Sequence, residues 1–141
     1  MKPWFDPEEM LIGGRWLRAA DTLDLHDPST GQPLARIPRG QSREIDAAIA
    51  AAHEARAGAW GRLTATERGR LLTELGRLVR TRIEDLAVIE AHDVGKPLSQ
   101  ARADATALAR YLEFYGGAAD KVHGATIPYL DGYTVYTLRE P

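Results

Sequence analysis

The sequence has no cysteine among its 141 residues, and this absence excludes disulfides, thiolate zinc sites and thiol nucleophiles within the chain. It also has no basic block, because lysine and arginine are spread from Lys2 to Arg139 and the formal net charge is -2. Nucleic acid is therefore not an expected partner, since neutralising a phosphate backbone takes clustered cations. Long apolar runs are missing as well, so we expect neither a membrane-spanning helix nor a membrane partner.

Motifs for catalysis and for cofactor binding are missing too. Neither the dinucleotide fingerprint G-x-G-x-x-G nor a P-loop occurs, so no cofactor-binding residue is predicted. The four histidines lack metal-ligand spacing, and we interpret them as surface or structural residues. His92 and Asp93 are neighbours, but adjacent side chains on a helix point about 100° apart, which favours a polar pair at a helix end over an acid–base pair. We predict no catalytic residue in this chain.

What is present is typical of a folded globular protein. Hydrophobic residues make up 44% of the sequence and charged residues 27%. A chain of this length is one ordinary domain or part of one. The order of its patterns predicts an α+β segment, with short strands first, helices in the middle and a β-hairpin at the end.

Residues 1–40 are predicted to form a small β unit. Gly13 and Gly14 separate the apolar pairs 11–12 and 16–17, and two glycines tolerate the positive φ angles of a tight hairpin. Further strands are expected over about 22–26 and 34–37, on either side of the turn-forming phrase DPSTG.

Residues 41–124 are predicted to form about three amphipathic helices. Ser42 is the expected N-cap of the first, which covers about 42–58. Thr64 and Glu67 match a capping box at the start of the second, whose long apolar stripe leaves a break near 82–84 open. The third helix begins at about Pro97.

Two sets of apolar residues stand out near the end of the chain. Tyr111, Phe114 and Tyr115 are spaced by three and four, which we interpret as core packing in preference to a ligand platform. Residues 125–141 are predicted to form a hairpin, with runs over 125–129 and 133–138 that put apolar groups on both of its faces. A lone two-stranded unit could hardly bury them.

Several phrases, in order, resemble the N-terminal part of the aldehyde dehydrogenase superfamily. An alanine-rich helix leading to Trp60 adds to this resemblance, which extends over nearly the whole chain. The phrases are LIGGRW at 11–16, DPSTG at 27–31, ERGRLL at 67–72, EAHDVGKP at 90–97, YGGAADK at 115–121, GATIP at 124–128 and YTLREP at 136–141.

The resemblance implies an α/β fold for the parent enzyme, which continues into a Rossmann-like domain and a catalytic domain. It implies oxidation of a small-molecule aldehyde to a carboxylic acid with NAD or NADP. That reaction needs a cysteine thiolate, an asparagine amide near the oxyanion and a glutamate that activates water. The sequence has neither cysteine nor asparagine, and the catalytic glutamate belongs to the part that follows. We therefore expect this segment alone to be inactive.

Family members also imply two sites. Many bind sodium or potassium, and the matching ligands here are the main-chain carbonyls of Leu25 and His26 and the carboxylate of Asp93, oxygen atoms that suit a hard cation. The third helix lines the substrate entrance in relatives, which assigns Ala103 and Ala107 to the wall of that tunnel. Packing of both alanines against a neighbouring helix is the equally weighted alternative.

The resemblance further implies a homo-oligomer assembled in part through the terminal hairpin, and a cytoplasmic location. Two positions depart from the family, because asparagine is common where Asp27 and Val94 stand. A different class of function stays open: a non-catalytic module that binds or oligomerises through its helices and hairpin.

Overall fold

A computed structural model describes residues 3–140, so residues 1, 2 and 141 of the predicted β unit and hairpin lie outside the described part. The first elements are two antiparallel hairpins. Strand β1 (Glu9–Ile12) pairs with β2 (Arg15–Arg18), and β3 (Thr22–His26) pairs with β4 (Pro33–Pro38). The predicted glycine turn is confirmed, with φ of 58° at Gly13 and 76° at Gly14.

The helical region contains more helices than predicted. Its elements are α1 (Ser42–Ala57), α2 (Ala59–Arg62), α3 (Ala65–Arg80), α4 (Ile83–Val94), α5 (Leu98–Ala118) and the 3₁₀ turn η1 (Ala119–Lys121). Ser42 is wrong as the N-cap of α1, because Gln41 holds that position and its backbone N–H donates to Glu44 Oε2 at 3.0 Å. The capping box of Thr64 and Glu67 is confirmed.

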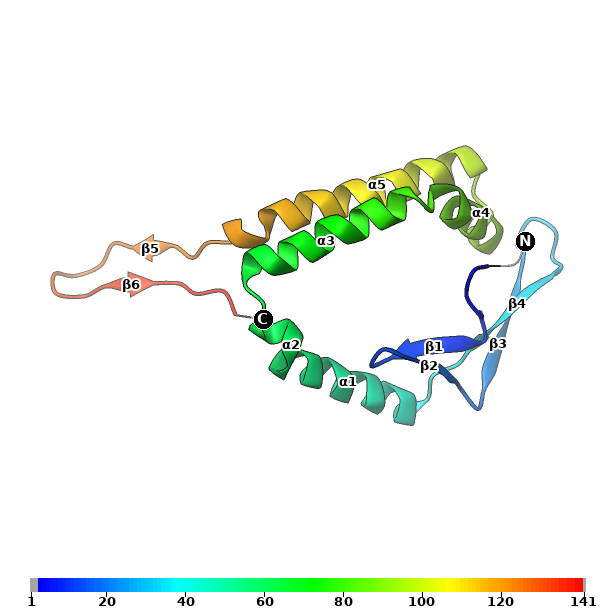
Figure 1. Ribbon diagram of the computed structural model, residues 1–141, viewed down its shortest axis with the longest axis horizontal. Helices are drawn as coiled ribbons and strands as arrows, with labels where there is room; N and C mark the ends of the chain where they lie inside the picture. The colour runs from blue at the N-terminus through cyan, green and yellow to red at the C-terminus, as the bar shows by residue number, and fades with distance from the viewer. Residues whose placement is uncertain (1–2, 141) are drawn as a thin grey trace.

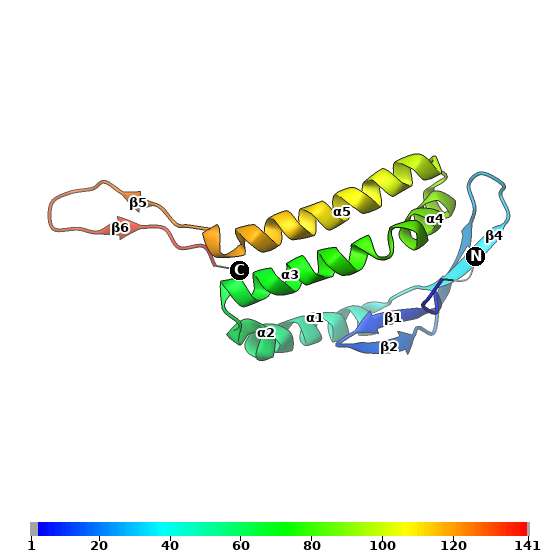
Figure 2. The ribbon, with the colours of Figure 1, turned by 45° about the horizontal axis from the view of Figure 1, so that its top comes forward.

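The predicted second helix is divided into α3 and α4. Arg82 leaves the helical conformation with φ of -122° and ψ of 14°. This break turns α4 out of line with α3, so that α4 can also contact α5 and bury Ala87. In both views α3 and α5 run side by side, and α1 and the first strands lie on the side of α3 away from α5 (Figure 1, Figure 2).

Glycine allows α3 and α5 to approach closely. A Cβ atom added at Gly69 would lie 2.3 Å from the carbonyl oxygen of Gly116, and one added at Gly76 would lie 2.9 Å from the carbonyl oxygen of Ala109. Both contacts are with backbone atoms, so only the missing side chain makes room for them.

The chain ends in a hairpin that projects beyond α5 (Figure 1). Its paired strands, β5 (Thr126–Ile127) and β6 (Val135–Tyr136), are two residues long, shorter than the predicted runs. The reason is that no third strand pairs with them within residues 3–140, and an isolated two-stranded ribbon is marginal.

The described residues enclose only a small core. Its apolar members are four alanines, and no larger side chain in residues 3–140 is fully buried. The accessible surface is 10852 Å², whereas a compact monomer of 15.5 kDa is expected to expose about 7,200 Å². The helices therefore hold together locally and leave much apolar surface uncovered. The buried alanines are Ala87, Ala101, Ala105 and Ala109.

Candidate functional site

The end of β3 and the end of α4 meet at one junction. Asp27, which follows β3, is 9% exposed, and its Oδ2 lies 3.0 Å from Nδ1 of His92 on α4. Its other oxygen accepts a 2.7 Å hydrogen bond from the backbone N–H of Ser29. The hydrogen bond to His92, followed by that from Ser29, holds the pKa of the Asp27 carboxyl below its ordinary value.

Gly95 closes this junction from the helix side. It ends α4 with a left-handed φ of 73°, and a Cβ atom placed there would lie 2.9 Å from Cγ of Pro28. The loop after β3 thus packs directly on the end of α4. His92 pairs with Asp27 and not with its neighbour Asp93, so the interpretation of residues 92 and 93 as a polar pair missed the true partner.

The three predicted cation ligands come from the elements that meet here. Leu25 and His26 are the last residues of β3, where the strand register shifts, and Asp93 is the penultimate residue of α4 with an exposed side chain. Within residues 3–140 no three acidic or histidine side chains cluster as a metal site. A site here would depend on main-chain carbonyls, so the cation stays a prediction.

Lys96 fixes the turn between α4 and α5, a role that local sequence spacing did not indicate. Lys96 donates to Glu90 Oε1 at 2.5 Å and to Asp104 Oδ2 at 2.7 Å. Asp104 first, and then Glu90, raise the pKa of Lys96 above its ordinary value. This cluster ties the first half of α5 to α4, and Ala103 immediately precedes Asp104.

A shallow hollow of about 700 Å³ lies along one side of α5. Ala103, which is exposed, and Ala107, which is half-buried, both line it. Within the described residues neither is buried against a neighbouring helix, unlike the buried alanines of α5. All the residues that line the hollow belong to α5, so this helix alone forms its wall. The lining residues are Arg102, Ala103, Thr106, Ala107, Arg110, Tyr111, Phe114 and Tyr115.

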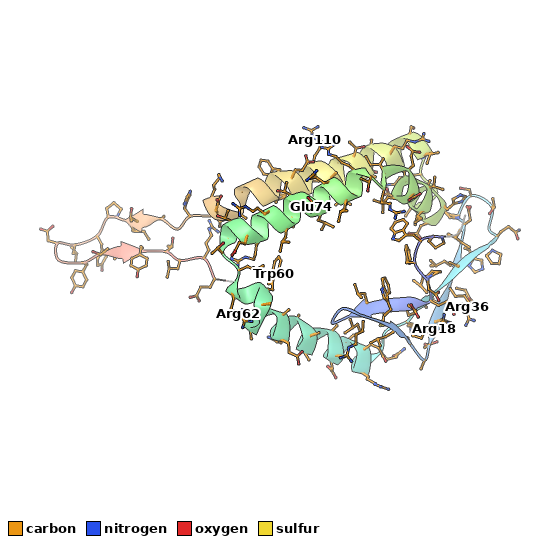
Figure 3. The ribbon with its side chains drawn as sticks, in the orientation of Figure 1. Arg18, Arg36, Trp60, Arg62, Glu74 and Arg110 are labelled. Carbon is orange, nitrogen blue, oxygen red and sulfur yellow. The ribbon has the colours of Figure 1, made fainter. Side chains whose placement is uncertain are left out.

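The aromatic residues of α5 are exposed and line this hollow, so their interpretation as core packing is wrong for the described part of the chain. Phe114 and Tyr115 touch edge to face with ring centroids 5.2 Å apart. Arg102 is held by Glu84 through bonds of 2.9 and 3.0 Å, whereas Arg110 lies on the outer edge of α5 (Figure 3). The hollow has small residues at one end and aromatic rings at the other.

The hairpin exposes its apolar side chains. Tyr129 and Tyr133 contact each other edge to face across the turn, with centroids 5.9 Å apart, yet both are exposed. Its base is anchored, because the backbone N–H of Ala125 donates to Thr137 Oγ1 at 2.8 Å.

Among the described helices, none is long and apolar enough to traverse a bilayer.

Comparison with known proteins settles the family. Residues 16–141 match the model of the aldehyde dehydrogenase family. The chain belongs to the aldehyde dehydrogenase family. The family resemblance inferred from the ordered phrases is thus confirmed, as is the α+β segment of an aldehyde dehydrogenase fold.

Individual aldehyde dehydrogenases match nearly the whole chain. Hydroxyisobutyraldehyde dehydrogenase of Mycolicibacterium austroafricanum is 42% identical over 137 residues, which cover 96% of this chain. A crystal structure from Burkholderia cenocepacia, assigned to the aldehyde dehydrogenases, is 57% identical with a TM-score of 0.88 over 95% of this chain. The NAD⁺ complex of a Bacillus cereus aldehyde dehydrogenase is 36% identical with a TM-score of 0.87 over 94%.

The chain spans 27% of the length of the Mycolicibacterium enzyme and 28% of each of the two solved structures. It has no cysteine, no asparagine and no dinucleotide fingerprint.

Proposed function

We propose that this chain is the N-terminal part of an NAD(P)-dependent aldehyde dehydrogenase subunit that oxidises aldehydes to carboxylic acids. The observation that carries the proposal is a match over 95% of this chain, with a TM-score of 0.88, that covers only 28% of the matched subunit. The large uncovered apolar surface supports the same conclusion, because it is the surface expected of part of a larger fold.

In this proposal the segment shapes and supports the active site, and the groups that react with the aldehyde belong to the rest of the enzyme. When bound to the rest of such an enzyme, NAD or NADP supplies the hydride acceptor. In our proposal Ala103 and Ala107 form part of the substrate entrance, where their small side chains leave room for bulky or aromatic aldehydes. The Lys96 cluster positions this wall by fixing the start of α5 on α4.

A monovalent cation at the junction of β3 and α4 is a further part of the proposal. The carbonyl oxygens of Leu25 and His26 and the carboxylate of Asp93 are hard donors that suit sodium or potassium. The contact between Asp27 and His92 supports it, because that contact fixes the end of β3 against the last turn of α4.

We also propose that the parent enzyme is a cytoplasmic homo-oligomer and that the hairpin takes part in its assembly. The support is local: exposed tyrosines lie on an anchored, projecting two-stranded unit whose edges pair with no further strand within residues 3–140. The same observation favours the second candidate function, a non-catalytic module that associates through the hairpin.

The test is to read the coding region beyond Pro141 and to assay its complete product. A frame that continues into a cysteine-containing catalytic domain, whose product forms NADH or NADPH in the presence of an aldehyde, supports the enzyme. The 141-residue chain is the matched control and should give no turnover. A stop codon directly after Pro141 would instead favour the binding module.

A further inference from the structure

Helix α5 has four charged side chains, two carboxylates and two guanidinium groups. Both carboxylates are bound by cations from neighbouring elements. Asp104 accepts a 2.7 Å hydrogen bond from Lys96 in the turn before the helix. Glu113 accepts hydrogen bonds from Arg80 on α3 with both of its oxygens, at 2.7 and 2.9 Å. The negative charges of α5 are therefore compensated from outside the helix.

The two arginines of α5 differ in their partners. The Nε of Arg102 donates to both carboxylate oxygens of Glu84, at 2.9 and 3.0 Å. In contrast, no carboxylate within residues 3–140 lies at ion-pair distance from Arg110. The pKa of Glu113, three positions away, is lowered mainly by its hydrogen bond from Arg80 and least by the charge of Arg110. Among the described residues, Arg110 thus has the one uncompensated charge on α5.

Arg110 lies in the wall of the hollow, between its small residues and its aromatic rings. Ala107 is three positions before it and Phe114 four positions after it, so the three residues share a helix face. Figure 3 shows Arg110 on the side of α5 away from α3. Within the described part of the chain, no acidic side chain lines the hollow. This wall therefore combines apolar surface with an exposed positive charge.

Such a wall matches a ligand that is partly apolar and partly anionic. A guanidinium group can bind a carboxylate through two parallel N–H···O bonds. Aromatic side chains such as Phe114 favour contact with another ring, with centroids about 4.5–7 Å apart. An aromatic ring bearing a carboxylate satisfies both requirements, because Arg110 and Phe114 are one helical turn apart.

We propose that Arg110 selects aldehydes that have a carboxylate at the end opposite to the carbonyl group. The inference rests on the proposed function, because it takes the hollow as one wall of the substrate entrance. Arg110 attracts and binds the carboxylate there, which raises kcat/KM for the anionic aldehyde. It has no part in the reaction at the carbonyl carbon, so neutral aldehydes are oxidised without its help.

The experiment compares two aldehydes of nearly the same shape in the full-length enzyme. One is 4-carboxybenzaldehyde, and the other is its neutral amide, 4-carbamoylbenzaldehyde. Formation of NADH or NADPH gives kcat/KM for each, and their ratio measures the preference for the carboxylate. Arg110→Gln should lower this ratio by about five- to tenfold, the size of a partly exposed charge-assisted hydrogen bond. Its kcat/KM for the amide should change by less than about twofold, since no ion pair with the described residues is broken.

Arg62→Gln is the matched control. Arg62 is exposed on α2, and within residues 3–140 it too has no carboxylate at ion-pair distance. Figure 3 shows it on the opposite side of α3 from α5. The substitution removes the same charge, but it should leave the ratio unchanged within about 1.5-fold, because charges beyond a Debye length are largely screened. Raising the ionic strength to about 0.5 M should lower the ratio of the wild type and hardly alter that of Arg110→Gln.

Three results would overturn the inference while leaving the enzyme assignment intact. They are an equal ratio in wild type and Arg110→Gln, an equal fall in Arg110→Gln and Arg62→Gln, and an equal loss of turnover for both aldehydes in Arg110→Gln with helical circular dichroism retained. Absence of turnover with both probes and with acetaldehyde in the wild type would instead count against the proposed function, and the inference would fail with it.

Discussion

Replacing Gly116 by alanine tests the close contact between α3 and α5. A Cβ atom at this position would lie 2.6 Å from Thr73 Oγ1, 2.7 Å from the carbonyl oxygen of Gly69 and 3.0 Å from the backbone nitrogen of Thr73. Two of these atoms belong to the backbone, and the third is held by a 3.0 Å hydrogen bond from Thr73 to the Gly69 carbonyl. The helices must therefore separate to admit the methyl group.

Two opposing contributions set the size of the effect. Alanine stabilises a helix interior by about 1 kcal/mol relative to glycine. Overpacking a tight contact costs about 1–3 kcal/mol, and its upper range applies where backbone atoms must move. For Gly116→Ala we expect a net loss of about 1–2 kcal/mol in the free energy of unfolding.

The next residue is the matched control. A Cβ atom at Gly117 meets nothing within 4 Å, so Gly117→Ala should stabilise by up to about 1 kcal/mol. Urea titration followed by far-ultraviolet circular dichroism measures both variants against the original chain. If Gly116→Ala unfolds at the same or a higher urea concentration than Gly117→Ala, the account of the helix contact is wrong.

Four further outcomes are expected. Thr64→Ala should cost about 1 kcal/mol of unfolding free energy through loss of the α3 cap. Hydrogen bonds from the Thr64 backbone N–H and then from its hydroxyl lower the pKa of Glu67, so their contribution is present above pH 4.5 and is lost as the pH falls through the folded pKa. The variant keeps the first bond and loses the second, so the difference in unfolding free energy between wild type and variant should shrink in acid without vanishing. In the full-length enzyme, Ala107→Phe should reduce kcat/KM for bulky aldehydes more than for acetaldehyde, and equal losses would count against the entrance assignment. Val135→Lys should reduce self-association in sedimentation without loss of helical dichroism, whereas a wild-type chain that is monomeric at tens of micromolar would refute assembly through the hairpin. Asp93→Ala should abolish the rise in melting temperature of the full-length enzyme on adding potassium, and an undiminished rise would remove Asp93 from the cation site.

Features determined within a few residues could be predicted from the sequence. The Gly13-Gly14 turn and the capping box of Thr64 and Glu67 depend on neighbours up to three positions away, and both are confirmed. The start of α1 shows the limit of such reasoning. Ser42 is a good cap by residue type, but Glu44 lies three residues after Gln41 and bonds to its backbone instead.

Contacts over long sequence separations could not be predicted in this way. Asp27 and His92 are 65 positions apart, and local spacing suggested only the neighbour Asp93 as a partner for His92. The one available signal was the aspartate at position 27, because a nearly buried carboxylate needs hydrogen-bond donors.

The periodicity of an apolar face also does not reveal what covers it. Tyr111, Phe114 and Tyr115 have the spacing of core residues, yet they are exposed in the described chain. Spacing defines which residues share a side of a helix, whereas burial depends on a neighbour that the same few residues do not encode.

Helix α5 links the base of the hairpin to the hollow that contains Ala103 and Ala107. The distance along the axis from Ala103 to Ala118 is about 22 Å at 1.5 Å per residue, and the intervening stretch is clamped to α3 at Gly116. Past its end, Asp120 accepts a 3.2 Å hydrogen bond from Thr66 on α3. The end of α5 from which the hairpin leaves is therefore braced on α3, and the wall of the hollow rests on the same pair of packed helices.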